Sequence, residues 1–273
     1  MMKQRSITPW LIIVPLIVFS IFPLVWMLMT SVKSYSDVYT FPPVYWPETF
    51  SLDFYRKVIN ETSTLTNMFN SIYVALCSTI LSVVFGAMAG WIFARGRVRG
   101  GHFLMRSVMV AYFLPQILTV IPLFILLQKL GLTNSFTGII IAHVALTFPF
   151  STWLLTDYIR SIPVEIEEQA RVDGAGDLTI FVKLILPLSW PGLATAAIFA
   201  FINSWNEFLY ALIILGTGSK QLVTTGLYNM VGGENAQWGP MMAATTLTLI
   251  PTLLLFAFVQ RRLVSGMTLG SVK

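Results

Sequence analysis

Charge and cysteine are both scarce in this chain of 273 residues. Only 11% of the residues are charged, against roughly 25% in soluble domains, while 56% are hydrophobic and the mean hydropathy is +0.75. This composition argues against a soluble globular protein and predicts a membrane protein. The single cysteine, Cys77, excludes an internal disulfide, and two histidines without a cysteine cluster offer no metal site.

The sequence also lacks a phosphate-binding loop. The stretch GTGSK at 216–220 does not have the G-x-x-x-x-G-K-[ST] spacing, and Gly174-Ala175-Gly176 lacks the third glycine of a dinucleotide fingerprint. No nucleophile–base set is apparent either, which argues against a membrane enzyme. We therefore expect that the chain holds no cofactor and that any ATP hydrolysis takes place on another protein.

Six apolar segments are long enough to cross a bilayer, which takes about 20 residues. They cover residues 9–30, 67–94, 107–127, 136–156, 188–215 and 241–259. With the N-terminus inside, the inner segments carry twelve lysines and arginines and the outer segments carry five. The positive-inside rule then places both termini in the cytoplasm. We predict one all-α membrane domain over residues 1–273, whose net charge of +5 reflects topology and not a nucleic-acid partner.

Charge is concentrated in the segment 160–187, the charged loop, between the fourth and fifth predicted spans. Eight charged residues fall within 160–183, so this segment must lie in water. Pro163 followed by three glutamates is typical of a helix start. An apolar side chain at every fourth position from Ile162 to Ala170 gives this short helix one apolar face.

Three residues predict how the charged loop continues. Gly174 can adopt the left-handed conformation that ends the first helix. Asp177 can cap a second helix, which Pro187 would then break. The result is a pair of short helices, too small for a core of its own, with one face that needs a partner.

The charged loop resembles the EAA loop of binding-protein-dependent ABC importer permeases. That motif reads E-A-A, three residues, G, nine residues, I-x-L-P. The chain has Glu168-Gln169-Ala170, Gly174 and Leu184-Ile185-Leu186-Pro187 at the same spacing, with Gln169 and Leu184 as mild departures. The longer run EQARVDGA at 168–175 is similar to the E-A-A-R-I-D-G-A of the carbohydrate branch.

The resemblance implies that the charged loop is a coupling helix, which docks on a cytoplasmic ATPase subunit. The alternative is an ordinary amphipathic connector between two spans. By its match to the motif, the resemblance assigns ATPase coupling to Glu167, Glu168, Ala170, Arg171, Asp173, Gly174, Ala175, Leu186 and Pro187.

One acid, Glu207, lies deep in an apolar segment with the sequence FINSWNEFLY. A charge at mid-bilayer costs on the order of 3 kcal/mol, so such residues face a bundle interior or a cavity. At helical spacing, Asn203, Asn206 and Tyr210 share one face with this acid, whereas Trp205 lies off that line. The stretch is similar to the W-N-E-F element of carbohydrate permeases, and amides, carboxylates and aromatic rings suit a sugar.

Two readings of this segment remain open. In the first, a solute path is lined by Asn203, Trp205, Asn206, Glu207 and Tyr210. In the second, Glu207 pairs with another helix and holds the bundle together. His143 in the fourth predicted span is expected to form a hydrogen bond between helices.

The C-terminal segment 260–273 is similar to the ending of maltose-type permeases, Q-R-x-x-V-x-G-L-T-x-G-A-V-K. In that family the tail reaches into the ATPase interface. The resemblance assigns this contact to Gly266, Thr268, Gly270 and Lys273.

Together these resemblances identify the chain as a multi-pass permease subunit of a type I ABC importer for a carbohydrate, in a prokaryotic cytoplasmic (inner) membrane. They imply a heterodimer with a second permease, two cytoplasmic subunits that bind ATP and Mg²⁺, and an extracytoplasmic solute-binding protein. The alternative is an ion-coupled secondary transporter with an intramembrane site at Glu207. Many transporters of that class are built from inverted repeats, and the sequence has no such internal symmetry.

Overall fold

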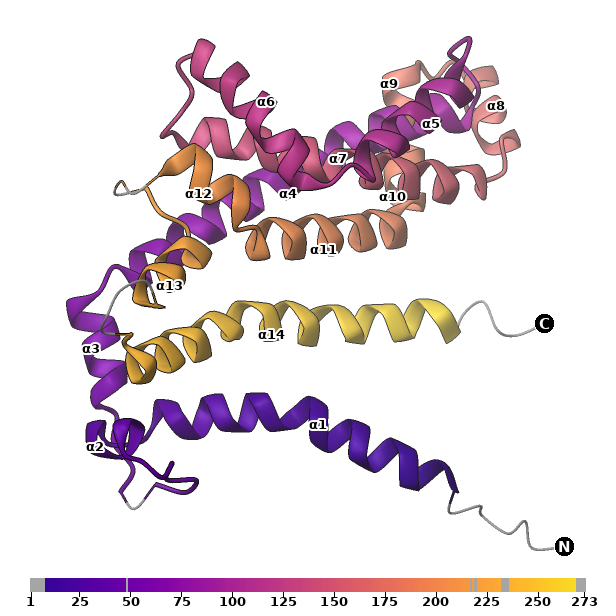
Figure 1. The fold of residues 1–273 in the computed structure, drawn as a ribbon. Helices are drawn as coiled ribbons and strands as arrows, with labels where there is room; N and C mark the ends of the chain where they lie inside the picture. Colours follow the sequence, from indigo (N-terminus) through magenta and orange to yellow (C-terminus); the bar gives the residue numbers. More distant parts are fainter. Residues whose placement is uncertain (1–7, 48, 217, 219, 232–235, 269–273) are drawn as a thin grey trace, which may run out of the picture. The chain divides into compact units, whose positions relative to one another are not determined.

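The computed structural model describes residues 8–47, 49–216, 218, 220–231 and 236–268, and within this part the chain is helical without β-strands (Figure 1). The elements are α1 (Thr8–Ser31), α2 (Tyr35–Tyr39), α3 (Asp53–Glu61), α4 (Thr64–Ala94), α5 (Gly101–Tyr112), α6 (Gln116–Lys129), α7 (Phe136–Arg160), α8 (Glu165–Val172), α9 (Asp177–Ile180), the π-helical turn η1 (Phe181–Ile185), α10 (Leu186–Leu188), α11 (Trp190–Asn206), α12 (Leu209–Leu215), α13 (Val223–Val231) and α14 (Trp238–Thr268). The prediction of an all-α protein is confirmed.

Four of these helices, α1, α4, α7 and α14, are long and apolar enough to cross a membrane. Two bent pairs would bring the number to six in the described part of the chain. Helices α5 and α6 meet at 101°, and the segment Asp177–Leu188 meets α11 at 78°. Apolar spans of this length are typical of a multi-pass membrane protein.

The predicted span 107–127 is not one straight helix. It falls on α5 and α6, which are separated by a break that ends at Pro115. Proline has no N–H and disfavours the helical conformation of the residue before it, so a helix ends readily at this point. A search for apolar runs misses such a break, because Gln116 is the one strongly polar residue between hydrophobic stretches on both sides of it.

The chain divides into two compact units, Met1–Thr66 with Gly226–Pro251, and Asn67–Thr225 with Thr252–Lys273. In the first unit, Phe54 and Val58 of α3 pack against Ala243 and Ala244 of α14. The second unit contains the charged loop and the segment around Glu207.

Helix α7 is central to the second unit, where it packs against α5, α11 and α12. It also lies close to α4 at two glycines of that helix. A Cβ atom added to Gly86 would lie 3.2 Å from Ser151 Cβ, and one added to Gly90 would lie 3.1 Å from the backbone nitrogen of Thr156. Because glycine has no side chain, the two helices can approach closely at these positions.

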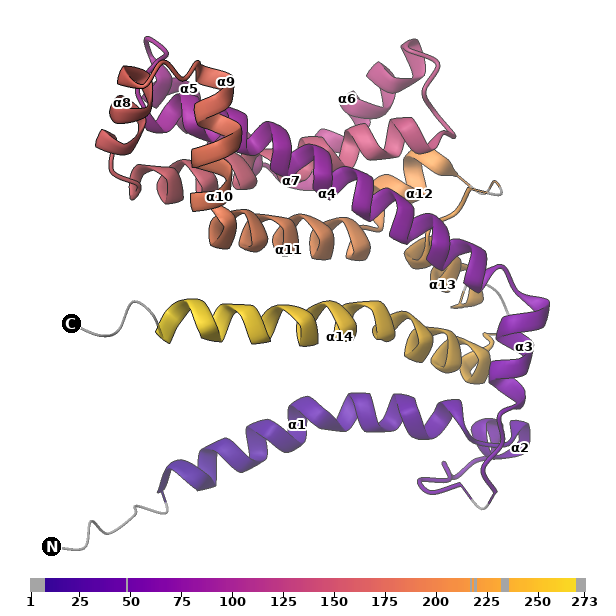
Figure 2. The same cartoon turned by 180° about the vertical axis from the view of Figure 1, so that it is seen from behind.

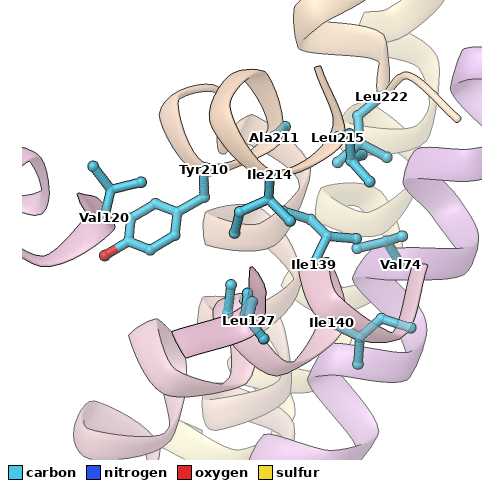
Figure 3. Packing of buried hydrophobic residues seen from close by; sticks show 11 residues of the cluster. Val74, Val120, Leu127, Ile139, Ile140, Tyr210, Ala211, Ile214, Leu215 and Leu222 are labelled. Atoms are coloured by element: carbon cyan, nitrogen blue, oxygen red, sulfur yellow. The ribbon is translucent and has the colours of Figure 1, made fainter. Parts of the chain in front are cut away.

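Two apolar clusters stabilise the second unit. One lies where α6, α7 and α12 meet and includes Leu127, Ile139 and Ile214 (Figure 3). The other joins α4, α7, η1 and α11 and includes Leu155 and Ile185. Within this unit, α8, α9 and α10 lie at one end and α6 and α12 at the other (Figures 1 and 2). The charged loop and the segment around Glu207 are therefore at opposite ends of the unit.

Candidate functional site

The first helix of the charged loop ends at Gly174, as predicted. The φ angle of this glycine is +84°, in the left-handed region. The N–H of Ala175 donates to the carbonyl of Ala170 at 2.9 Å, and the N–H of Gly174 donates to that of Arg171 at 3.0 Å. These two bonds form a Schellman motif, which satisfies the last carbonyls of α8 and reverses the chain.

The prediction that Asp177 caps the second helix is wrong. Gly176 occupies the N-cap position, and the Asp177 carboxylate instead accepts hydrogen bonds from Arg171 at 3.1 Å and from Arg97 at 3.2 Å. The Arg171 and Arg97 hydrogen bonds lower the pKa of the Asp177 carboxyl below its ordinary value. This acid therefore links the two helices of the charged loop to the turn that follows α4.

The second helix of the charged loop does not stop at Pro187 as predicted. It continues from α9 through η1 to Leu188, and the chain then bends by 78° at Ser189. In η1 the N–H of Leu186 bonds to the carbonyl of Phe181, five residues earlier. Such a π-helical turn is a local widening of the helix, here placed directly before the proline.

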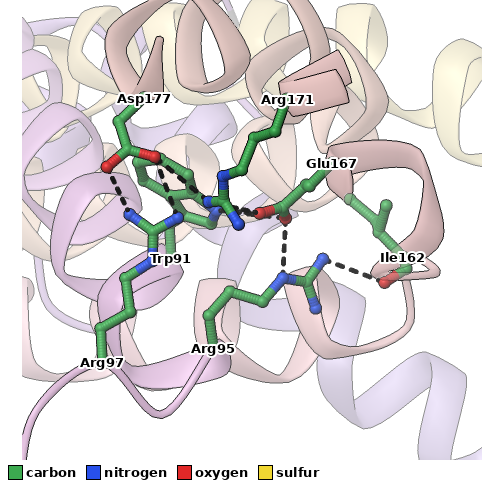
Figure 4. Close-up of polar contacts among 7 residues, drawn as sticks. All are labelled: Trp91, Arg95, Arg97, Ile162, Glu167, Arg171 and Asp177. Carbon is green, nitrogen blue, oxygen red and sulfur yellow. Dashed lines mark hydrogen bonds and ion pairs between the residues drawn. The ribbon is translucent and has the colours of Figure 1, made fainter. Parts of the chain in front are cut away.

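Glu167 forms the centre of a buried ion-pair network (Figure 4). Its side chain is only 1% exposed, and Arg95 Nε donates to Oε1 at 2.7 Å. The indole N–H of Trp91 lies 3.2 Å from both carboxylate oxygens. A second nitrogen of Arg95 donates to the carbonyl of Ile162 at 3.0 Å. These contacts attach α8 firmly to the end of α4, because buried charge-assisted hydrogen bonds are strong and short.

Glu167, which the motif assigns to ATPase coupling, is buried and paired within the chain, so its carboxylate does not lie on the surface of the charged loop. Its part in coupling stays a prediction. The other assigned residues differ in exposure. Those exposed to solvent are Glu168, Arg171, Asp173, Gly174 and Pro187. Those half-buried, with side chains packed on the apolar cluster of this end, are Ala170, Ala175 and Leu186.

Two apolar side chains at this end point away from the unit. Val172 is 88% exposed and Leu178 is 76% exposed, one on each side of the Gly174 turn. The predicted apolar stripe partly faces inward, since Ile162 is buried and Ala170 is half-buried. The exposed tip of the charged loop thus presents both apolar and charged side chains.

The partners of Glu167 on α4 could not be recognised from any motif in the sequence. Trp91 lies in a predicted span, and Arg95 is one of the inner positive charges. They lie four residues apart and so share one helix face at the end of a span, a pattern that could have indicated a binding face for an acid.

A pocket of about 950 Å³ lies at the opposite end of the second unit, and we call it the polar pocket because polar side chains stand in its otherwise apolar lining. Its walls come from α5, α6, α7, α11 and α12. Of the five residues predicted to line a solute path, Asn203, Asn206, Glu207 and Tyr210 line this pocket. Trp205 does not, because it is buried and stacked on Phe201 with ring centroids 6.1 Å apart.

The two asparagines differ from Glu207 in their freedom to bind a solute. Both are exposed, and each donates one bond to a carbonyl of its own helix, Asn203 to Phe199 at 2.8 Å and Asn206 to Ile202 at 3.0 Å. Within the described part of the chain, neither carboxamide oxygen has a hydrogen-bond partner. Both side chains therefore retain hydrogen-bonding capacity toward the pocket.

The spacing predicted that Glu207 shares one helical face with its polar neighbours. This prediction is wrong, because the helix does not continue through Glu207. Helix α11 ends at Asn206, and Glu207 has an extended backbone with ψ of 129°. Its two carboxylate oxygens accept hydrogen bonds from the backbone N–H groups of Tyr210 at 2.8 Å and Ala211 at 3.0 Å. The acid therefore caps the N-terminus of α12, where negative charge is favoured.

His143 of α7 holds this break from the other side. Its Nδ1 forms a hydrogen bond of 2.6 Å with the Ser204 hydroxyl of α11, which confirms the expected bond between helices. Its Nε2 lies 3.4 Å from a carboxylate oxygen of Glu207. The sequence indicates both residues but gives no sign that they are in contact.

The assigned tail residues fall at the edge of the described structure. Gly266 and Thr268 belong to α14, while Gly270 and Lys273 lie outside the described residues. The predicted contact of this tail with an ATPase stays a prediction.

Known proteins match the chain along most of its length. The family model "Binding-protein-dependent transport system inner membrane component" matches residues 82–269. A putative ABC transporter permease protein (ORF1) of Streptomyces antibioticus is 37% identical over 218 residues, which are 80% of this chain and 95% of that one. The trehalose transport system permease protein SugB of Mycobacterium tuberculosis (strain CDC 1551 / Oshkosh) is 32% identical over 275 residues, with 100% of both chains covered.

A solved structure supports the same fold. A chain from the crystal structure of a bacterial ABC transporter involved in the import of the acidic polysaccharide alginate superposes with a TM-score of 0.82 at 22% identity. The match covers 96% of this chain and 99% of the other. With the family match over more than half of the sequence, these findings show that the chain belongs to the inner membrane components of binding-protein-dependent transport systems and has the fold of an ABC importer permease.

Proposed function

We propose that this permease carries a sugar or oligosaccharide across the cytoplasmic membrane, driven by ATP hydrolysis on two separate cytoplasmic subunits that dock on the charged loop. A second, homologous permease would complete the pathway, and an extracytoplasmic solute-binding protein would deliver the solute. ATP and Mg²⁺ would bind to the partner subunits. Both termini and the charged loop would face the cytoplasm, in line with the distribution of lysine and arginine.

The observation that carries this proposal is the attachment of the charged loop to the spans. Glu167 ties α8 to α4 through Arg95 and Trp91, and Asp177 ties the second helix to Arg97. A force applied to the exposed tip would therefore move α4 with it, because the loop cannot shift without breaking the buried Glu167–Arg95 pair. A flexible connector would not transmit such a displacement.

The exposed tip has the composition of a docking surface. Val172 and Leu178 present apolar side chains, while Glu168 and Asp173 add charge at the rim. Interfaces combine an apolar centre with a polar rim in this way. We assign the contact with the ATPase to these exposed residues. Glu167 would hold them in position.

The polar pocket suits a sugar. Two carboxamide side chains and the aromatic rings of Tyr112 and Phe113 line a volume of about 950 Å³, which is large enough for an oligosaccharide segment. The similarity to a trehalose permease and to an alginate importer chain favours the same solute class. An ion-coupled mechanism at Glu207 is disfavoured, because both of its oxygens already accept backbone hydrogen bonds.

The charged-loop assignment is tested by Gly174→Val in the complete transporter, reconstituted in liposomes with ATP inside. A β-branched residue at φ of +84° is strained by about 1–2 kcal/mol, so we expect weakened ATPase association and loss of uptake with normal membrane insertion. Gly176→Ala is the matched control, since no atom lies within 4 Å of the added Cβ and φ is −73°. Normal uptake in the Gly174 variant would contradict the assignment.

The energy source is tested on the same liposomes. Uptake should require ATP inside together with the ATPase subunits, and membranes that hold this subunit alone should neither bind nor hydrolyse ATP. Uptake driven by a proton or sodium gradient without ATP would contradict the proposal and favour a secondary transporter.

A further inference from the structure

A second cavity, of about 290 Å³, lies where the end of α4, the turn at 95–100, the start of α5 and the last turns of α7 meet. It shares no lining residue with the polar pocket. Its apolar wall includes Phe93 and Trp153, and its polar wall includes His102, Arg106 and Arg160. We call it the basic pocket.

The basic pocket contains a positive charge that the protein does not neutralise. Arg160 lies 3.5 Å from Asp157, which also lines the pocket, so these two charges offset each other. The side chains of Arg106 and His102, in contrast, are exposed, and no hydrogen bond or ion pair joins them to the residues that the structure describes. The free guanidinium can therefore form two parallel hydrogen bonds with an oxyanion such as a phosphate.

The backbone at the start of α5 adds donors on the same side. Gly100 is the N-cap and has no side chain to accept a bond from the first turn of the helix. Within the described part, the N–H groups of His102 and Phe103 have no acceptor. An uncapped helix N-terminus favours an anion, and here it adjoins an unpaired arginine.

The position of the basic pocket is that of a membrane–water boundary. The same turn carries Arg95 and Arg97, which bind Glu167 and Asp177 of the charged loop. Directly beyond it α5 becomes apolar, and Phe103 is 74% exposed. A tryptophan beside arginines at the end of a span is typical of the headgroup level of a bilayer.

We infer that the basic pocket binds the phosphate group of an anionic phospholipid from the cytoplasmic leaflet. Basic pockets between spans on this side of a membrane suit such headgroups. A volume of about 290 Å³ fits a headgroup, while the acyl chains would remain in the bilayer beside the exposed apolar face of α5. The inference uses the cytoplasmic orientation of the charged loop from the proposed function, but not the identity of the solute.

A bound headgroup would also hold the turn that anchors the charged loop. Arg106 and His102 follow the turn that carries Arg95 and Arg97 by only a few residues. Neutralising the free positive charge would stabilise the turn in the position from which these arginines reach α8 and α9. The lipid would thus support the attachment of the charged loop without contact to the ATPase.

The test is lipid binding to the purified complete transporter, measured by native mass spectrometry with added phosphatidylglycerol or phosphatidylcholine. The wild-type complex should retain phosphatidylglycerol in preference. Arg106→Gln should weaken this retention about fivefold, the effect of one arginine near an anionic surface. Arg99→Gln is the matched control, because this arginine is exposed, lies in the same turn and does not line the pocket. It should leave retention unchanged.

Three results would overturn the inference. One is equal retention of the two lipids by the wild-type complex, and another is equal weakening by the Arg99 and Arg106 variants, which would indicate diffuse surface charge. The third is full competition by millimolar inorganic phosphate, which would indicate a site for the free anion. Uptake measured beside binding separates this test from the proposed function, since a complex that transports normally but shows no lipid preference contradicts only the lipid site.

Discussion

The second unit contains two buried glutamates, at opposite ends, that the protein satisfies in different ways. Glu167 is paired with side chains from another helix, Arg95 at 2.7 Å and Trp91 at 3.2 Å. Glu207 is paired mainly with backbone N–H groups of the helix that follows it, at 2.8 and 3.0 Å. The first acid joins two segments distant in sequence, whereas the second stabilises a local break in the chain.

Under the proposed function, the two ends have different tasks. A loop that transmits force needs strong cross-links to the spans, and the Glu167 network supplies them. A pocket that admits a solute needs side chains with spare hydrogen-bonding capacity, and the break at Glu207 places Asn203 and Asn206 beside a cavity without involving them in the scaffold. In both regions the buried acid positions residues that are exposed.

The largest expected effect comes from removing the charge of Glu167. Glu167→Gln keeps the shape but leaves Arg95, whose side chain is only 10% exposed, without its counter-charge. Breaking a buried pair in this way costs about 3–5 kcal/mol. We expect faster proteolysis of the charged loop and loss of ATPase co-purification.

Glu168→Gln is the control for this change, because the neighbouring glutamate is exposed and has no ion-pair partner in the described structure. It should alter stability by less than about 0.5 kcal/mol. Equal loss of loop protection in both variants would show that the loop responds to net charge and not to the buried pair.

A smaller effect is expected at the other end. Glu207→Leu removes the carboxylate that caps α12, a loss that costs about 0.5–2 kcal/mol, so the yield of assembled transporter should fall. Glu207→Gln retains one acceptor oxygen and should lose about half as much. Yield is measured by gel filtration of the solubilised complex beside uptake.

Asn206→Ala tests a pocket residue that does not hold the helices together, because this asparagine lines the pocket but bonds only to its own helix. It should assemble normally and reduce uptake. Full assembly with lost uptake in the Glu207→Leu variant would instead make this acid part of the solute path.

The smallest effect concerns Asp177 and pH. Hydrogen bonds from Arg171 and Arg97 lower the pKa of this carboxyl, so its stabilising contribution is complete above its ordinary pKa of 3.8. As the pH falls through the lowered value, the carboxylate gains a proton and the contribution is lost. A spin label on Leu178→Cys should therefore show constant mobility down to about pH 4 and greater mobility below it.

Asp177→Asn is the reference for this titration, because it cannot ionise. In this variant the spin label at position 178 should be slightly more mobile than in the wild type at neutral pH. Its mobility should not change as the pH falls below about 4. A transition at the same pH in the asparagine variant would assign the change to another carboxyl.

Several features could be predicted because they depend on short-range physics. The positive φ of Gly174 follows because the first helix of the charged loop must end where the chain reverses direction. Glycine adopts that conformation at little cost. The close approach of α4 and α7 follows from Gly86 and Gly90, whose lack of a side chain is evident in the sequence. Each of these predictions needed only a few neighbouring residues.

Other features could not be predicted for the opposite reason. The two residues at the break between α11 and α12 are Glu207 and Phe208, so neither a proline nor a glycine marks it in the sequence. The break is stabilised by the carboxylate cap and by His143, which is more than sixty positions away in the chain. A prediction from residue spacing alone does not include such a distant partner, so it extends the helix through the break.

Contiguous residues are enough to show that the chain is an all-helical membrane protein, where its charged loop lies and which family motif that loop resembles, because hydrophobic length and local turn chemistry are properties of neighbouring residues. The roles of the two buried acids, in contrast, depend on contacts between distant segments. A carboxylate in an apolar environment must find partners, and whether these are the arginine and tryptophan of α4 or the backbone of α12 depends on which segments folding brings together.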